Sequence, residues 1–101
     1  MFQIPAQKIK LFLVDDHRMV IDMWASMLAA DPKFEIVGTS LDAEKALEEI
    51  KIKLPNVVLL DITLPGISGI ELAKSLREKV PTAKLLGVSM HTNIILIKQM
   101  L

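Results

Sequence analysis

Three aspartates stand where two apolar runs of the sequence end. Asp15 and Asp16 follow the run Lys8–Val14, and Asp61 follows the run Asn56–Leu60. Both runs are short and rich in Val, Ile and Leu, which is typical of buried strands. The carboxyl ends of parallel strands lie along one edge of an α/β sheet, and ligands bind there. We therefore expect the three carboxylates to meet in one acidic pocket.

Carboxylates packed this closely repel one another unless a proton or a cation joins them. A hard divalent ion with oxygen ligands fits such a pocket, and Mg²⁺ is the cofactor that we expect. A carboxylate can also attack phosphorus and form an aspartyl phosphate, a reaction that needs a cation and a hydrogen-bond donor for the transferring oxygens. Asp61 is the expected nucleophile, with Asp15 and Asp16 holding the ion. Ser89, at the end of a further apolar run, is the expected donor.

Short apolar runs alternate with stretches of helical periodicity along the rest of the chain. The expected strands are Lys8–Val14, Phe34–Gly38, Asn56–Leu60 and Lys84–Ser89. The expected helices are His17–Ala30, Asp42–Lys53 and Ser68–Lys79, and a last segment, Thr92–Leu101, begins a fourth helix or forms a strand. Alternating strands and helices with short connections predict right-handed βαβ units and a parallel sheet, and therefore the α/β class.

Apolar side chains recur at helical spacing in each expected helix, and we predict that they face the core. They are Val20, Met23, Trp24 and Met27 in the first helix, Ala43, Ala46, Leu47 and Ile50 in the second, and Gly69, Leu72, Ala73 and Leu76 in the third. The methionines are accordingly predicted to serve packing. Glu49 and Lys53 are expected to form an ion pair on the outer face of the second helix.

The composition limits the classes of protein that need consideration. The 101 residues suit one domain, and 51% of them are hydrophobic. Twelve basic and twelve acidic residues give a net charge of +0 without a basic cluster, so we expect no direct contact with nucleic acid or membrane. Cysteine is absent, which excludes thiolate metal sites, and no segment approaches the ~20 apolar residues of a membrane span. We expect a cytoplasmic location.

His17 and His91 flank the predicted acidic edge. No third ligand of suitable type and spacing accompanies them, so zinc is not expected and both are predicted to be cap or surface residues. The sequence also lacks the glycine-rich motifs that cradle nucleotide phosphates.

Three motifs, in this order and at this spacing, resemble the receiver domain of two-component response regulators. They are VDDH (Val14–His17), LLDITLPGISG (Leu59–Gly69) and LLGVSMH (Leu85–His91). The DDH motif and the PGISG turn look most like receivers that precede a helix-turn-helix output domain. The resemblance implies a doubly wound, flavodoxin-like sheet of strand order 2-1-3-4. It assigns residues 8–101 to the receiver and residues 1–7 to an N-terminal extension.

The resemblance also implies a role for each matching residue. Asp61 resembles the phosphoacceptor, and Asp16 resembles a direct Mg²⁺ ligand alongside it. Asp15 resembles the acid that acts on the metal through a water molecule. Thr63 would supply a backbone carbonyl to the metal, and Ser89 would be the switch hydroxyl that moves onto the phosphoryl group. The implied partner is a sensor histidine kinase, and the implied result of phosphorylation is a conformational switch that regulates output, most often transcription.

The sequence departs from the family pattern at its end. The fifth strand, with the lysine that pairs with the phosphoryl group, and the fifth helix do not appear before Leu101. We therefore expect the metal site to persist and phosphoryl transfer to be slower. We also expect the chain either to self-associate through its apolar C-terminal face or to be marginally stable. The side chains of that face are Ile94, Ile95, Leu96, Ile97, Met100 and Leu101.

Two alternatives to a phosphorylated receiver remain. One is a degenerate receiver that works as a dimerisation or binding module and is never phosphorylated. The other is a phosphohydrolase of the haloacid-dehalogenase type, which has a second aspartate two residues after its nucleophile. Thr63 stands at that position here, which disfavours the hydrolase. We therefore expect a regulatory protein and not an enzyme with an external substrate.

Overall fold

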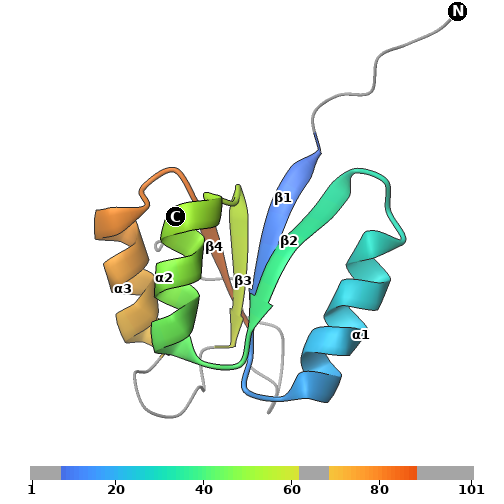
Figure 1. Cartoon of the computed structure of the whole chain (residues 1–101), viewed down its shortest axis with the longest axis horizontal. Coiled ribbons are helices and arrows are strands. Elements are labelled where there is room, and N and C mark those ends of the chain that lie inside the picture. The colour runs from blue at the N-terminus through green and yellow to red at the C-terminus, as the bar shows by residue number, and fades with distance from the viewer. Residues whose placement is uncertain (1–7, 62–68, 89–101) are drawn as a thin grey trace, which may run out of the picture.

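A sheet of four parallel strands forms the centre of the molecule (Figure 1). The computed structural model describes residues 8–61 and 69–88. The strands are β1 (Ile9–Val14), β2 (Phe34–Ser40), β3 (Val57–Asp61) and β4 (Lys84–Val88), and the helices are α1 (Arg18–Ala29), α2 (Ala43–Lys53) and α3 (Gly69–Lys79). Their order across the sheet is β2-β1-β3-β4, with every neighbouring pair parallel. The predicted α/β class and the strand order 2-1-3-4 are therefore confirmed.

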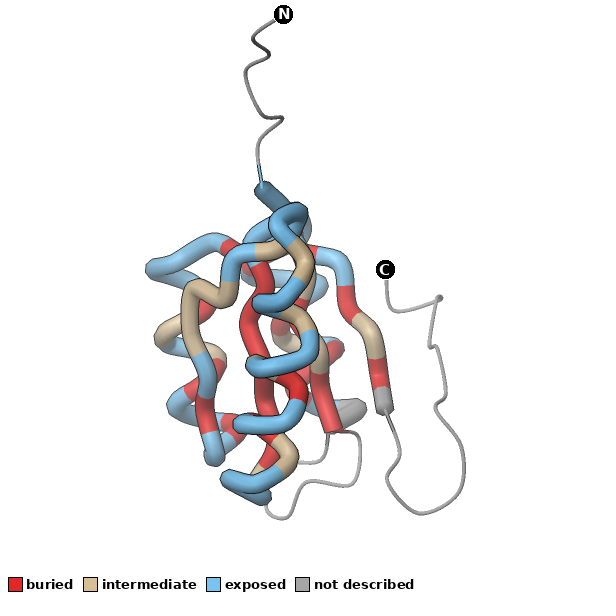
Figure 2. The backbone as a smooth tube through the Cα atoms, turned by 90° about the vertical axis from the view of Figure 1, so that its right-hand side faces the viewer, coloured by how far each residue is buried: buried red, intermediate tan, exposed pale blue. Residues whose placement is uncertain are grey.

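Helices cover both faces of the sheet, with α1 on one face and α2 and α3 on the other (Figure 1). Side chains alternate between the two faces along a strand. In β1, Leu11 and Leu13 accordingly pack toward α1, while Phe12 and Val14 pack toward α2 and α3. All four are buried, as expected for a central strand covered on both sides, and Figure 2 shows that the buried residues follow the strands through the middle of the molecule.

The predicted inward faces of α2 and α3 are confirmed for the side chains that the structure describes, because Ala46, Ile50, Leu72 and Leu76 are all buried. The burial of Gly69, also predicted to face inward, is not described. Asp42 defines the start of α2, since its carboxylate accepts a hydrogen bond from the backbone N–H of Lys45 at 3.0 Å. The helix ends at Lys53, and its C-cap residue Leu54 has a left-handed backbone (φ 49°) and precedes a proline.

The predicted inward face of α1 is wrong in part. Met23 and Met27 are 47% and 65% exposed, whereas Ile21 and Trp24 are buried against β1. The same spacing of i, i+3, i+4 and i+7 also fits a set that is shifted by one position, namely Ile21, Trp24, Ala25 and Leu28. The shifted set is the one that packs on the sheet. Periodicity alone could not choose between two overlapping apolar stripes, and these methionines do not serve the core.

A β-bulge interrupts the pairing of β1 with β2. Leu11 lies opposite Ile36 and Phe12 lies opposite Gly38, which leaves Val37 as the additional residue. The carbonyl of Val37 accepts a hydrogen bond from Lys53 Nζ at 2.9 Å. This contact takes the place of the ion pair predicted between Lys53 and Glu49, which is not formed in the described part of the chain.

Some predictions fall on residues outside the described ranges. These are the N-terminal extension 1–7, the segment Thr92–Leu101, and the apolar C-terminal face proposed for self-association. None of the described helices is long and apolar enough to cross a membrane.

Replacing Gly38 by alanine tests the packing at the bulge. An added Cβ would lie 2.5 Å from Phe12 Cε2, and because the Phe12 ring is fully buried, any shift of the ring would disturb the surrounding core. We expect Gly38→Ala to lower the free energy of unfolding by about 1–3 kcal/mol, measured by urea denaturation. The neighbouring Thr39 is exposed, and Thr39→Ala serves as the control, with an expected loss below about 1 kcal/mol.

The physical cause can be isolated in a Phe12→Leu background. That change removes the ring opposite Gly38, so the added methyl group should cost less there than in the wild-type chain. An equal cost of Gly38→Ala in both backgrounds would show that the ring contact is not the cause.

Candidate functional site

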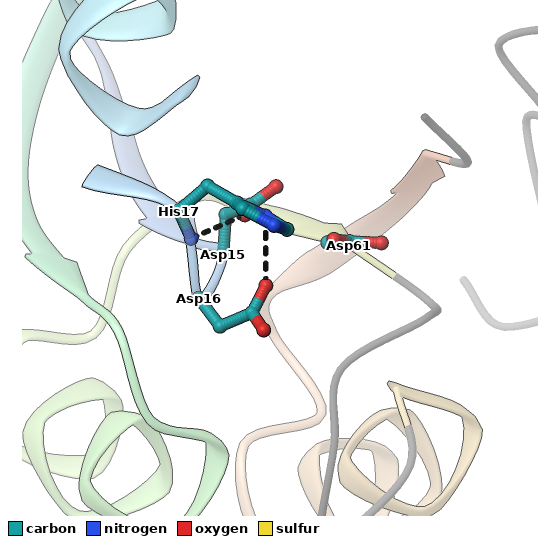
Figure 3. A group of neighbouring side chains, drawn as sticks. All are labelled: Asp15, Asp16, His17 and Asp61. Atoms are coloured by element: carbon teal, nitrogen blue, oxygen red, sulfur yellow. Dashed lines mark hydrogen bonds and ion pairs between the residues drawn. The ribbon is translucent and has the colours of Figure 1, made fainter. Parts of the chain in front are cut away.

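The ends of β1 and β3 bring the predicted carboxylates together. Val14 pairs with Leu60, so that Asp15 and Asp61 emerge side by side from neighbouring strands. Both residues are 0% exposed. One potential ligand atom from each of Asp15, Asp16, His17 and Asp61 lies within 4.8 Å of the others, and Figure 3 shows the four side chains around one space. The convergence expected from the sequence is present.

Asp15 is held rigidly by the turn that follows β1. Its backbone N–H donates to the carbonyl of Ser40 at 3.1 Å, which extends the pairing of β1 and β2 beyond Val14. Its Oδ1 accepts a hydrogen bond of 2.7 Å from the backbone N–H of His17. Its other oxygen, Oδ2, is buried and accepts no hydrogen bond from any described residue. A buried carboxylate oxygen in that condition is costly and is suited to binding a cation.

Burial raises the pKa of Asp15 above its ordinary value, because desolvation penalises the charged form. The hydrogen bonds from His17 lower the pKa and oppose this effect in part, while the charge of Asp61 raises it further. Without a cation, Asp15 in this pocket is therefore protonated more readily than an exposed aspartate is.

His17 extends over the acidic pocket. Its backbone is the N-cap of α1, and its carbonyl accepts hydrogen bonds from Val20 and Ile21. Its side chain makes no capping hydrogen bond; instead, Nδ1 lies 2.9 Å from Asp15 Oδ1 and 2.9 Å from Asp16 Oδ1 (Figure 3). The hydrogen bond to Asp15 and the charge of Asp16 raise the pKa of the imidazole.

The prediction that His17 is a cap or surface residue is confirmed, but it did not include the contacts of the side chain. The residue is a cap in its backbone and 63% exposed in its side chain, as a surface residue would be. Its double contact with Asp15 and Asp16 had only one signal in the sequence, namely that it directly follows them. Chain adjacency alone does not say where a ring points, since the turn between β1 and α1 decides its direction.

The donor set fits a divalent cation. Carboxylate oxygens from Asp15, Asp16 and Asp61 surround a small space, and the side chain of Asp16 is 30% exposed, which leaves that space open to solvent. Hard ions such as Mg²⁺ favour such oxygen ligands and retain several water molecules. Two further predicted participants, Thr63 and Ser89, lie outside the described residues.

Comparisons with known proteins place the chain among signalling proteins. The family described as "Response regulator receiver domain" matches residues 11–101. The transcriptional regulatory protein DegU of Brevibacillus brevis is 34% identical over 89 residues, which cover 88% of this chain and 38% of that protein. The chain spans only 38–42% of the length of this and three other curated relatives.

Solved structures show the same fold. The signal receiver domain of the putative response regulator NarL from Mycobacterium tuberculosis has a TM-score of 0.81 and 31% identity, covering 87% of this chain and 71% of that one. A CheX–CheY–BeF₃–Mg²⁺ complex from Borrelia burgdorferi has a TM-score of 0.75 and 25% identity, covering 82% of this chain and 63% of that one.

Asp15→Asn tests the electrostatic cost of the pocket. The folded-state pKa of Asp15 lies above that of the unfolded chain, so its ionisation opposes folding once the pH exceeds the ordinary aspartate value of 3.8. In the presence of a chelator at pH 7, we expect the variant to be more stable by on the order of 1 kcal/mol, measured by thermal denaturation.

This advantage should shrink as the pH falls through the folded-state pKa, because wild-type Asp15 then becomes neutral as well. Added Mg²⁺ should raise the melting temperature of the wild-type chain more than that of the variant. If the wild-type chain were more stable than Asp15→Asn at pH 7 with chelator present, the burial of charged Asp15 would not be destabilising, and the prediction would be wrong.

Proposed function

The chain belongs to the family of response regulator receiver domains, and we propose that it accepts a phosphoryl group from a sensor histidine kinase on Asp61. The observation that carries this proposal is the meeting of Asp15, Asp16 and Asp61 at the carboxyl ends of β1 and β3. In the proposed reaction, a carboxylate oxygen of Asp61 attacks phosphorus and the P–N bond of the phosphohistidine breaks. The donor imidazole leaves with the bonding electrons and takes up a proton.

Mg²⁺ is the proposed cofactor, held directly by Asp16, Asp61 and the backbone carbonyl of Thr63, and by Asp15 through a water molecule. When bound, the ion would offset the negative charge on the transferring oxygens. The unsatisfied, buried Oδ2 of Asp15 supports a cation here, and so does the name of the similar Borrelia burgdorferi complex, which includes Mg²⁺ and BeF₃. Ser89 is proposed to donate a hydrogen bond to the phosphoryl group and to move with it.

The proposed outcome of phosphorylation is regulation and not turnover of a substrate. Four curated relatives, DegU among them, are named as transcriptional regulators or activators. This chain matches 38–42% of the length of each. We propose a similar output for the protein of which residues 8–101 form the receiver, with DNA contacted by an output domain and not by this segment. A cytoplasmic location, the extension 1–7 and self-association through the C-terminal face remain predictions of the sequence.

Phosphorylation from a small donor is the direct test. We expect intact-mass spectrometry of the chain with Mg²⁺ and acetyl phosphate to show one added phosphoryl group, mapped to Asp61. Asp61→Asn should abolish the adduct because the amide is not a nucleophile of this kind. Asp22→Asn is the matched control, since Asp22 is an exposed acid on α1 outside the pocket.

Other results of the same experiment would reject the proposal. The absence of an adduct in the wild-type chain, with Mg²⁺ shown to bind, would favour the degenerate receiver that acts by binding alone. Repeated hydrolysis of added phosphate esters would favour an enzyme.

Asp16→Asn tests the metal assignment. Loss of one charged oxygen ligand should weaken Mg²⁺ binding by roughly tenfold or more, measured by isothermal titration calorimetry. The same substitution at Asp22 should leave the affinity unchanged. Equal Mg²⁺ affinities for Asp16→Asn and the wild-type chain would remove Asp16 from the metal site.

A further inference from the structure

The imidazole of His17 occupies a position that the proposed Mg²⁺ site does not explain. Its Nδ1 lies 2.9 Å from Asp15 Oδ1 and 2.9 Å from Asp16 Oδ1, and it belongs to the same 4.8 Å cluster as Asp61. The side chain makes no capping hydrogen bond to α1; its hydrogen bond to Asp15 Oδ1 and its ion-pair contact with Asp16 hold the ring over the pocket. The ring therefore contributes a nitrogen atom to the rim of a pocket otherwise formed by oxygen atoms (Figure 3).

These spacings match those between neighbouring ligands of one ion. With metal–ligand distances of about 2.0–2.1 Å, adjacent ligands of an octahedral ion are about 2.9–3.0 Å apart and opposite ligands about 4.2 Å apart. The Nδ1–Oδ1 distance of 2.9 Å to Asp16 equals the first spacing, while the 4.8 Å upper limit of the cluster exceeds the second.

We propose that His17 Nδ1 is a metal ligand, so that the pocket is a mixed nitrogen and oxygen site that favours Mn²⁺ and Ni²⁺ over Mg²⁺. This inference rests on the proposed metal-dependent function of the same pocket. On coordination, the metal replaces the proton on Nδ1, that proton passes to solvent, and the neutral ring keeps its proton on Nε2. The 63% exposure of the side chain leaves Nε2 able to bond to water.

Ligand chemistry gives the direction of the preference. Mg²⁺ binds oxygen and keeps much of its water, so an imidazole adds little to its affinity. The later first-row ions bind imidazole well, and their affinity for nitrogen and oxygen sites rises from Mn²⁺ to Ni²⁺. The imidazole of His17 should therefore increase the affinity for Ni²⁺ most, the affinity for Mn²⁺ less, and the affinity for Mg²⁺ hardly at all.

The two oxygens of the Asp15 carboxylate have different surroundings, and one of them supports a cation at this place. Asp15 Oδ2 is fully buried and accepts no hydrogen bond from the described residues, which leaves it available for a ligand. Asp15 Oδ1 also accepts the backbone N–H of His17 at 2.7 Å, a bond that fixes the start of α1 and hence the direction of the imidazole.

The test compares the wild-type chain, without a histidine tag, with His17→Ala and His17→Phe. Phenylalanine keeps a ring of similar size and removes both nitrogens, and Asp22→Asn again serves as a control outside the pocket. In titrations with each metal chloride alone, we expect both His17 variants to lose tenfold or more in Ni²⁺ affinity and to change less than threefold in Mg²⁺ affinity. Circular dichroism verifies that both variants are folded.

A spectroscopic signal tests the bond itself. Pulsed EPR of the Mn²⁺-loaded wild-type chain should show ¹⁴N coupling from the imidazole, and both His17 variants should lack it. Coupling that persists in the variants, equal losses for all three ions, or higher affinity for all of them would overturn the inference. Higher affinity of the variants for all three ions would show that the His17 side chain competes with the metal for the carboxylates and does not bind it.

The phosphorylation test keeps this inference separate from the proposed function. If Asp61 is phosphorylated with Mg²⁺ but no nitrogen coupling is found, His17 is not a ligand and the receiver function stands. If coupling is found and no adduct forms on Asp61, the metal assignment stands and the receiver function fails.

Discussion

The burial of two carboxylates at the ends of adjacent strands is the constraint on which the rest of this structure depends. Asp15 and Asp61 are both 0% exposed, and the desolvation of Asp15, together with the charge of Asp61 beside it, opposes folding unless a proton or a cation is present. The apolar packing on both faces of β1 and β3 has to offset this cost. The molecule thus resembles many proteins in which a functional site reduces stability and the core compensates.

Backbone contacts hold the Asp15 carboxylate in the pocket. The pairing of Asp15 with Ser40 continues the β1–β2 ladder into the pocket, and the bond from the His17 N–H fixes the Asp15 carboxylate. The bulge at Val37 shifts the register of β2 by one residue before this point, with Lys53 satisfying the carbonyl of Val37. A local irregularity midway along the strand pair therefore helps to set which residues meet at its carboxyl end.

His17 links the acidic pocket to α1. Its carbonyl starts the helix, and its side chain lies against Asp15 and Asp16. A single residue thus belongs both to the helix terminus and to the charged cluster. Because α1 packs on the sheet through Ile21 and Trp24, the direction of the imidazole depends on the packing of the whole helix. Metal binding at the pocket and the position of α1 should consequently be coupled.

The amino-acid sequence by itself determined the alternation of strands and helices, the parallel sheet and the convergence of Asp15, Asp16 and Asp61. It could do so because strand periodicity and the common direction of parallel strands are local and general rules. Tertiary structure alone decided which of two overlapping stripes of α1 faces the sheet, since Met23 and Ile21 fit the helical spacing equally well. It also decided that Lys53 bonds to Val37 and not to Glu49, and that the His17 ring turns over the carboxylates. Those outcomes depend on where distant backbone segments lie, which no local pattern of residues encodes.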